Sequence, residues 1–352
     1  MIIPLKKILV LVLVIILVTV AITTGALAYI IYWPVFPSKS AEKVDILVRW
    51  GSSFSTVADQ CQKAGIVRSA EQFITTAKLF KKTEKLRVGK FTLHHDMSNY
   101  HAMKALIEGP QTYINVTLPE GYDSRKFAQI LEHHLDIDSA KFVSLVTDSF
   151  FIGEMGFNTN SLEGYLYPET YAFNYGLNAE QVAKTLVHQF KKSVPDSLIT
   201  IAENRDYTFN DILTLASIIE GEAMVDEEMP IISSVYHNRL KRGMRLQADP
   251  TIQYIISDGP RRLLLRDLKI DSPYNTYKYS GLPPGPINNP SAKAIYSALF
   301  PIESDYLYFV ANGDGTHSFS ETYQQHLRAK QRFDQVRERV KREKKQAVFN
   351  EK

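Results

Sequence analysis

The N-terminal part of the chain carries a continuous apolar run without a charged residue, over positions 8–31. At about 1.5 Å per residue, a helix of this length reaches roughly 36 Å, enough to cross a hydrocarbon core of about 30 Å with some tilt. Two lysines precede the run, and Tyr32 and Trp33 follow it as residues typical of a membrane interface. The pattern therefore predicts a transmembrane helix over residues 8–33.

A cleaved signal peptide is the alternative for this segment, because Ala26-Leu27-Ala28 resembles a small-residue cleavage site. The apolar run is much longer than the roughly 7–15 residues of a signal-peptide core, which favours an uncleaved, single-pass anchor. Because basic flanks stay inside, we expect residues 1–7 to form a cytoplasmic stub and the rest of the chain to lie outside the membrane.

A short tether and a small module follow the anchor. Residues 34–43 contain prolines and serines, which are typical of a tether. Alternating and helical periodicities then predict a strand over 44–48, helices over 55–64 and 70–80, a strand over 86–93 and a helix over 98–109. This order indicates a compact α+β module over residues 44–110.

A larger α+β domain is predicted over residues 111–335, with a basic tail over 336–352. Its clearest elements are a strand over 113–118 and helices over 124–134, 178–191 and 208–223. The last helix has the strongest pattern: Thr208 with Asp211 resembles a capping box, and apolar residues recur three or four positions apart. The tail is rich in arginine and lysine, and we expect it to be a solvated helix.

Two carboxylates lie near the end of the helix predicted over 208–223. Glu220 and Glu222 fall on opposite flanks of its apolar stripe, so both border apolar surface. A carboxyl group beside apolar surface has a raised pKa, as a general acid near neutral pH requires. Periodicity leaves a second interpretation open, in which both are edge residues or ion-pair partners of Arg239 and Arg245.

Polar and aromatic residues downstream of this helix fit the recognition of a sugar, whose hydroxyls need hydrogen bonds and whose ring face stacks on aromatic rings. They lie among proline-rich loops, which have a simpler interpretation as rigid connections. With Glu222, the candidate binding residues are Asn238, Arg239, Gln247, Asp249, Thr251, Tyr254, Tyr274, Asn275, Thr276 and Tyr277.

Composition adds few constraints. The 352 residues include 41 Lys+Arg and 38 Asp+Glu, for a net charge of +3, so nothing in the charge demands nucleic acid as a partner. The single cysteine, Cys61, cannot form an internal disulfide, and its simplest interpretation is a small buried residue. Four of the nine histidines form the adjacent pairs His94-His95 and His133-His134, whose side chains point in different directions, and the sequence has no H-E-x-x-H motif. We therefore expect no metal and no cofactor.

A penicillin-binding type of serine enzyme is suggested only by Ser40-Ala41-Glu42-Lys43, which fits S-x-x-K. The S-D-N and K-T-G motifs that accompany it in such enzymes are absent from the sequence. This class of enzyme is therefore disfavoured.

Several motifs in one order resemble the YceG-like family of endolytic murein transglycosylases. They are Pro119-Glu120-Gly121, Leu162-Glu163-Gly164, Leu215-Ala216-Ser217-Ile218-Ile219-Glu220, Asn238-Arg239-Leu240, Gly243-Met244-Arg245-Leu246-Gln247-Ala248-Asp249-Pro250-Thr251, Tyr274-Asn275-Thr276-Tyr277, Gly281-Leu282-Pro283-Pro284-Gly285-Pro286-Ile287 and Leu307-Tyr308-Phe309-Val310. One departure is Gly221, where a charged or polar residue is common in the family. The anchor and a LysM-like module before the catalytic domain fit the family as well.

The resemblance implies a single-pass inner-membrane enzyme with a periplasmic catalytic domain. It would cleave the bond between N-acetylmuramic acid and N-acetylglucosamine in nascent glycan strands and leave 1,6-anhydro ends. Glu220 is expected to act as general acid and then as general base, with Glu222 and Asp249 as candidates for supporting roles. Penicillin-binding synthases are expected as partners. The competing interpretation is a non-catalytic peptidoglycan-binding protein, in which residues 44–109 bind glycan and the rest is scaffold.

Overall fold

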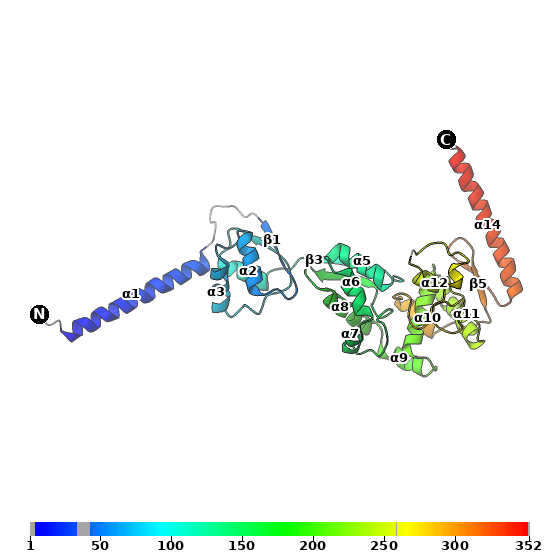
Figure 1. Ribbon diagram of the computed structural model, residues 1–352, viewed down its shortest axis with the longest axis horizontal. Helices are drawn as coiled ribbons and strands as arrows, with labels where there is room; N and C mark the ends of the chain where they lie inside the picture. The colour runs from blue at the N-terminus through cyan, green and yellow to red at the C-terminus, as the bar shows by residue number, and fades with distance from the viewer. Residues whose placement is uncertain (1–3, 34–42, 258, 351–352) are drawn as a thin grey trace. The chain divides into compact units, whose positions relative to one another are not determined.

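The computed structural model describes residues 4–33, 43–257 and 259–350 (Figure 1). The chain divides into two compact units, which we call the N-terminal and C-terminal units. The N-terminal unit comprises Met1–Val116, His134–Asp136 and Tyr171–Asn178, and the C-terminal unit comprises Thr117–His133, Ile137–Thr170 and Ala179–Lys352.

Helix α1, Leu5–Tyr32, is long and apolar enough to cross a membrane. It begins three residues before the predicted start at residue 8 and takes in both lysines, because helical hydrogen bonding does not stop where the apolar run begins. The Trp33 amide donates to the Tyr29 carbonyl over 3.0 Å and ends the helix. Residues 1–3 of the predicted stub and 34–42 of the predicted tether lie outside the described residues.

The small module has the predicted order of strand, helix, helix and strand, followed by a helix. These elements are β1 (Lys43–Val48), α2 (Phe54–Lys63), α3 (Ala70–Leu79), β2 (Gly89–His94) and α4 (Asn99–Glu108). Strand β2 is shorter than the predicted 86–93, because antiparallel β1 ends at Val48, whose partner is Gly89. A serine side chain caps each helix, and one buried apolar cluster that includes Phe73 and Cys61 fills the module.

A segment from much later in the chain belongs to the same unit. The Trp50 amide, just after β1, donates to the Gly176 carbonyl over 2.7 Å. A Cβ added to Gly176 would stand 2.6 Å from the Val48 carbonyl oxygen, and its φ is +84°. Glycine is therefore the residue that fits this close approach.

The C-terminal unit is mainly helical, and within it β5 (Tyr308–Ala311) pairs antiparallel with β6 (His317–Ser320). Strand β3 (Tyr113–Leu118) pairs with β4 (Glu169–Asn174), and only residues 117–118 and 169–170 of these two strands belong to the C-terminal unit. The helices are α5 (Ser124–Leu135), α6 (Ser139–Val146), α7 (Ser149–Glu154), α8 (Ala179–Ser193), α9 (Asp196–Glu203), α10 (Phe209–Glu222), α11 (Met229–Lys241), α12 (Asp249–Ile255), α13 (Ala292–Leu299) and α14 (Tyr323–Asn350), with 3-10 turns at Asp226–Glu228 and Asp267–Lys269.

Helix α10 packs against α9, α11, α12 and α13, and Figure 1 shows it beside α11 and α12. Its predicted capping box is confirmed, since Thr208 and Asp211 exchange side-chain and backbone hydrogen bonds. The sequence predicted one buried stripe, but every residue from Ile212 to Ile219 is buried because neighbouring helices cover several of its sides. The hydroxyls of Thr214 and Ser217 donate to carbonyls of the same helix, which lowers the cost of burying them.

Helix α14 runs through the predicted boundary between residues 335 and 336 without a break. Arg328, Arg332 and Arg337 are exposed along it, as expected of a solvated helix. The predicted helical form of the tail is confirmed up to Asn350, and its residues 351–352 lie outside the described residues.

The capping box yields a stability prediction. Thr208→Ala removes the side-chain acceptor for the Asp211 amide and should lower the free energy of unfolding by about 1 kcal/mol. Urea denaturation measures this effect. The matched control is Thr185→Ala, in the exposed middle of α8, where alanine should leave stability unchanged or raise it slightly. Equal losses in both variants would contradict the prediction.

Candidate active site

The carboxylate of Glu220 in the last turn of α10 is bound by the start of α13. Its Oε2 atom accepts a hydrogen bond from the Ser291 amide over 3.0 Å and another from the Ser291 hydroxyl over 2.6 Å. Ser291 is also the N-cap of α13, where its hydroxyl accepts from the Ala294 amide over 3.1 Å. One short side chain therefore caps a helix and holds one oxygen of Glu220.

The loop after β3 approaches Glu220 as well. A Cβ added to Gly121 would stand 3.4 Å from Cγ of Glu220 and 3.9 Å from its Oε1, so the oxygen that Ser291 does not bind lies beside this glycine. Burial and the nearby Glu220 carboxylate raise the pKa of Glu120 above its ordinary value. Two carboxyl groups thus lie close together at the end of α10.

Glu222 has a different environment from Glu220. Its Oε1 accepts a hydrogen bond from the Tyr236 hydroxyl over 3.1 Å, and the Asp249 backbone also donates to its carboxylate. Burial, followed by repulsion from the Asp249 carboxylate, raises the pKa of Glu222 to about 7. The raised pKa expected from the apolar flank of α10 is confirmed for this residue.

A cleft of about 600 Å³ opens beside these carboxylates. It is lined by Gly121, Asp123, Arg125, Lys126, Gln129, Gly221, Glu222, Asp249, Pro250, Gln253, Tyr254, Ile256, Ser257, Gly259, Pro260, Ile287 and Asn288. Glu220 is not one of the lining residues, but its neighbours Gly121 and Gly221 are. A Cβ on Gly221 would stand 2.7 Å from Cβ of Pro250, so the departure from the family pattern at this position matches a tight approach of α12.

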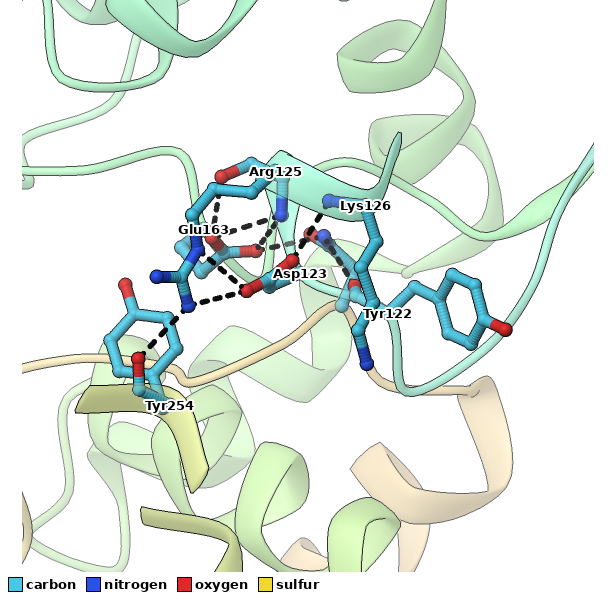
Figure 2. Close-up of polar contacts among 8 residues, drawn as sticks. Tyr122, Asp123, Arg125, Lys126, Glu163 and Tyr254 are labelled. Atoms are coloured by element: carbon cyan, nitrogen blue, oxygen red, sulfur yellow. Dashed lines mark hydrogen bonds and ion pairs between the residues drawn. The ribbon is translucent and has the colours of Figure 1, made fainter. Parts of the chain in front are cut away.

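The start of α5 provides a charged wall of the cleft (Figure 2). The Arg125 guanidinium donates to Asp123 Oδ2 over 2.8 and 2.6 Å and to the Tyr254 carbonyl over 2.9 Å. The ammonium of Lys126 lies 4.7 Å from the ring centre of Tyr122. A cation and an exposed aromatic ring thus lie next to each other at the cleft.

Some of the predicted binding residues come together at this cleft. Glu222, Asp249 and Tyr254 line it directly. The Tyr277 hydroxyl donates to the Asp249 carboxylate, and the Tyr274 ring lies 5.1 Å from the Tyr254 ring. Gln247 is exposed with a positive φ of 51°, outside the cleft lining.

Other predicted binding residues use their polar atoms inside the protein. Asn238 donates to the Ser304 and Tyr306 carbonyls, Arg239 to the Leu307 and Leu246 carbonyls, and Asn275 to the Leu268 and Ile270 carbonyls. The hydroxyls of Thr251 and Thr276 lie 2.9 Å apart, and both threonines are buried. These residues do not line the cleft, and their polar atoms are bonded to other parts of the protein. The Arg245 guanidinium donates to the Tyr277 carbonyl.

Sequence reasoning did not single out Ser291, Asn289, Arg125 or Lys126. Ser291 precedes a short helical pattern, which is an N-cap signal, but nothing local connects it to Glu220. Glu163 was recognised only as part of a motif and had no assigned role. Among the described residues, no group of three or more His, Cys, Asp or Glu side chains is arranged to hold a metal ion.

The YceG-like family model matches residues 46–332 of the chain. The chain belongs to the YceG-like family. It is 33% identical over 310 residues to the endolytic murein transglycosylase of Bacillus subtilis, a match that covers 84% of this chain and 86% of that protein. It is also 30% identical over 306 residues to the endolytic murein transglycosylase of Streptococcus pneumoniae, with 78% of this chain but only 55% of that protein covered.

The fold is similar to that of a solved relative. A crystal structure at 2.6 Å of a YceG-like protein from Listeria monocytogenes superposes with a TM-score of 0.56 at 32% sequence identity. The match covers 82% of this chain and 99% of the Listeria chain. Sequence and structure comparisons therefore lead to the same family.

The raised pKa of Glu222 predicts how stability depends on pH. Folded Glu222 keeps its proton up to about pH 7, whereas the unfolded carboxyl loses it near its ordinary pKa of 4.5, so its contribution makes stability fall as pH rises across this window. Glu222→Gln should therefore gain stability relative to wild type between pH 5 and pH 8. Urea unfolding at both pH values measures the difference, with exposed Glu203→Gln on α9 as the control. The prediction fails if the two variants respond alike.

Proposed function

We propose that this chain is an endolytic murein transglycosylase that cuts the bond between N-acetylmuramic acid and N-acetylglucosamine inside glycan strands and leaves 1,6-anhydro ends. The observation that carries the proposal is the setting of Glu220 beside a polar and aromatic cleft. Its carboxylate is held on one oxygen by Ser291 and has its other oxygen next to Gly121. The names of the relatives supply the substrate class.

The two oxygens of Glu220 suit a residue that acts first as acid and then as base. Because Ser291 donates twice to Oε2, the transferable proton belongs on Oε1, at the side of cleft-lining Gly121. In the first step, Oε1–H donates to the glycosidic oxygen as its bond to the anomeric carbon breaks. In the second step, the carboxylate takes the proton of the muramyl C6 hydroxyl, whose oxygen bonds to the same anomeric carbon. The Ser291 donors stabilise the carboxylate between these steps.

The other carboxyl groups have supporting roles in this proposal. Glu222 and Asp249 line the cleft and can orient sugar hydroxyls, while Tyr254 offers a ring face for stacking. The remaining predicted residues outside the cleft lining have a structural role, because their hydrogen bonds join backbone and side-chain groups inside the protein; they are Asn238, Arg239, Asn275, Thr251 and Thr276. No second carboxylate is needed as a nucleophile, because the C6 hydroxyl is part of the substrate itself.

Loss of the general acid and base tests the proposal. Glu220→Gln keeps the Ser291 contact to an oxygen but has no proton to transfer, so the rate of glycan cleavage should fall at least about 100-fold, as general acid–base catalysis contributes 10² to 10⁴. Mass spectrometry of digested, uncrosslinked glycan strands measures both the rate and the chemistry of the new ends.

Each outcome of that experiment has a clear meaning. Glu203→Gln, an exposed carboxylate on α9, should digest strands like wild type. Equal release of products by wild type and Glu220→Gln would favour the non-catalytic peptidoglycan-binding protein. If the products instead carry reducing N-acetylmuramic acid ends, water has been added to the glycosidic bond. The enzyme would then be a hydrolase that uses a second carboxylate such as Glu120, and not a transglycosylase.

The proposal places the enzyme on the membrane through residues 8–33, with its catalytic domain outside the cytoplasm on the periplasmic face of the inner membrane. The strand–helix–helix–strand order of the small module supports a LysM-like unit that contacts glycan. Anchoring would keep cutting close to the penicillin-binding synthases, which are the partners we propose.

Thiol labelling tests this orientation. The single native cysteine, Cys61, is fully buried, so an introduced cysteine is the reactive one. Thr185→Cys on exposed α8 should react with a membrane-impermeant maleimide in intact protoplasts or spheroplasts. Lys6→Cys, on the expected cytoplasmic side, should react only after lysis. The reverse pattern would overturn the orientation.

A further inference from the structure

Glu163 is a buried carboxylate with only 3% of its surface exposed, between α5 and the loop before α13 (Figure 2). The Ser124 amide donates to both of its oxygens over 3.0 and 3.1 Å, and the Ser124 hydroxyl donates to Oε2 over 2.7 Å. The Asn289 side-chain amide donates to Oε1 over 2.9 Å. The nearby Arg125 guanidinium is bound to Asp123 instead.

The Ser124 amide and the Asn289 side-chain nitrogen can only donate, whereas the Ser124 hydroxyl can donate or accept. The ionised Glu163 carboxylate accepts from all three groups, and a protonated Glu163 keeps them only if its O–H points to the Ser124 hydroxyl. Burial raises the pKa of Glu163 to about 7, and the groups that face it are Ser124, Asp123, Arg125, Tyr254 and Tyr274. A buried charge of this kind is costly, and its hydrogen bonds to fixed segments offset that cost.

Asn289 connects Glu163 by hydrogen bonds to two other segments, the one at Gly164 and Leu166 and the loop after β3. Its side-chain oxygen accepts from the Gly164 and Leu166 amides over 2.9 and 3.1 Å, and its side-chain nitrogen also donates to the Tyr122 carbonyl over 3.1 Å. Its backbone carbonyl accepts a hydrogen bond from the Gly121 amide, and its backbone amide donates to the Tyr122 carbonyl, both over 3.0 Å. Every hydrogen-bonding position of the Asn289 side chain is therefore used.

The segments that Asn289 joins are the ones that hold Glu220. On one side, Asn289 is followed by Pro290 and then by Ser291, which donates twice to Glu220 Oε2. On the other side, Asn289 binds Gly121, the residue beside Glu220 Oε1. The fixed φ of Pro290 leaves little freedom between Asn289 and Ser291. Movement of Asn289 would thus displace both contacts of Glu220.

We propose that Glu163 is a positioning residue for the reaction. Through Asn289 it fixes the positions of Ser291 and of the loop at Gly121, and these two contacts fix the orientation of the Glu220 carboxyl group. This role rests on the proposed function, because it has meaning only if Glu220 transfers protons. Glu163 touches no substrate, since it does not line the cleft.

A double-mutant cycle in the full chain tests the role. Glu163→Gln places an N–H against the Ser124 amide, which donates to both oxygens of Glu163, and should lower kcat by about 100-fold with KM within about twofold, the scale of a misplacement near 1 Å. Ser291→Ala removes one of the contacts through which Glu163 acts, the hydroxyl hydrogen bond to Glu220, and leaves the Ser291 amide and the loop at Gly121. In the Ser291→Ala background, Glu163→Gln should therefore lower kcat by clearly less than it does in the wild-type background, because coupled residues are non-additive.

Several results would overturn the role. An unchanged kcat in Glu163→Gln, or multiplied losses in the double variant, would show that Glu163 does not act through Ser291. If Glu163→Gln does not fold, Glu163→Asp takes its place, because its shorter side chain keeps the charge but moves the carboxylate away from the donors. The proposal then requires that the loss of kcat in Glu163→Asp also be smaller in the Ser291→Ala background. Thermal unfolding of each variant, with Glu203→Gln as control, distinguishes a loss of folding from a change in the orientation of the Glu220 carboxyl group.

Failure of the proposed function gives a different pattern from failure of the positioning role. If Glu220→Gln cleaves glycan as fast as wild type, the proposed function falls, and the positioning role of Glu163 falls with it. If Glu220→Gln is inactive while Glu163→Gln is fully active, only the positioning role is lost.

Discussion

The complete burial of the middle of α10 is the constraint on which the site depends. With every residue from Ile212 to Ile219 enclosed by neighbouring helices, the helix can neither rotate nor slide without exposing apolar surface or opening cavities. Glu220 follows this buried stretch directly, so its backbone is as firmly placed as the core. Only the side chain has freedom left, and donors from other segments remove it.

Local signals in the sequence were enough to predict much of the fold. The apolar period and the pair Thr208 and Asp211 located α10 almost to the residue, and the module's strands and helices followed from their own periodicities. The hydrogen-bond partners of the carboxylates could not be predicted from local sequence patterns, because Ser291 is 71 positions from Glu220 and Asn289 is 126 positions from Glu163. No periodicity reports such distant pairs.

A related physical cause explains why only some of the predicted binding residues line the cleft. Polar side chains on loops can serve a ligand or the loops themselves, and their type does not distinguish the two. Asn238 and Asn275 each donate to two backbone carbonyls, whereas Asp249 and Tyr254 line the cleft. A loop with few regular hydrogen bonds needs such internal partners before it can present a binding surface.

The bond between Trp50 and Gly176 bears on the order in which the chain acquires its structure. The apolar cluster of the small module is complete once residue 107 has been synthesised, so its core can collapse while the rest of the chain is still on the ribosome. The strand-end contact at Gly176 must wait for a much later stretch, Tyr171–Asn178. Until then the Trp50 amide lacks this partner, so this edge is a point where nascent copies can mispair.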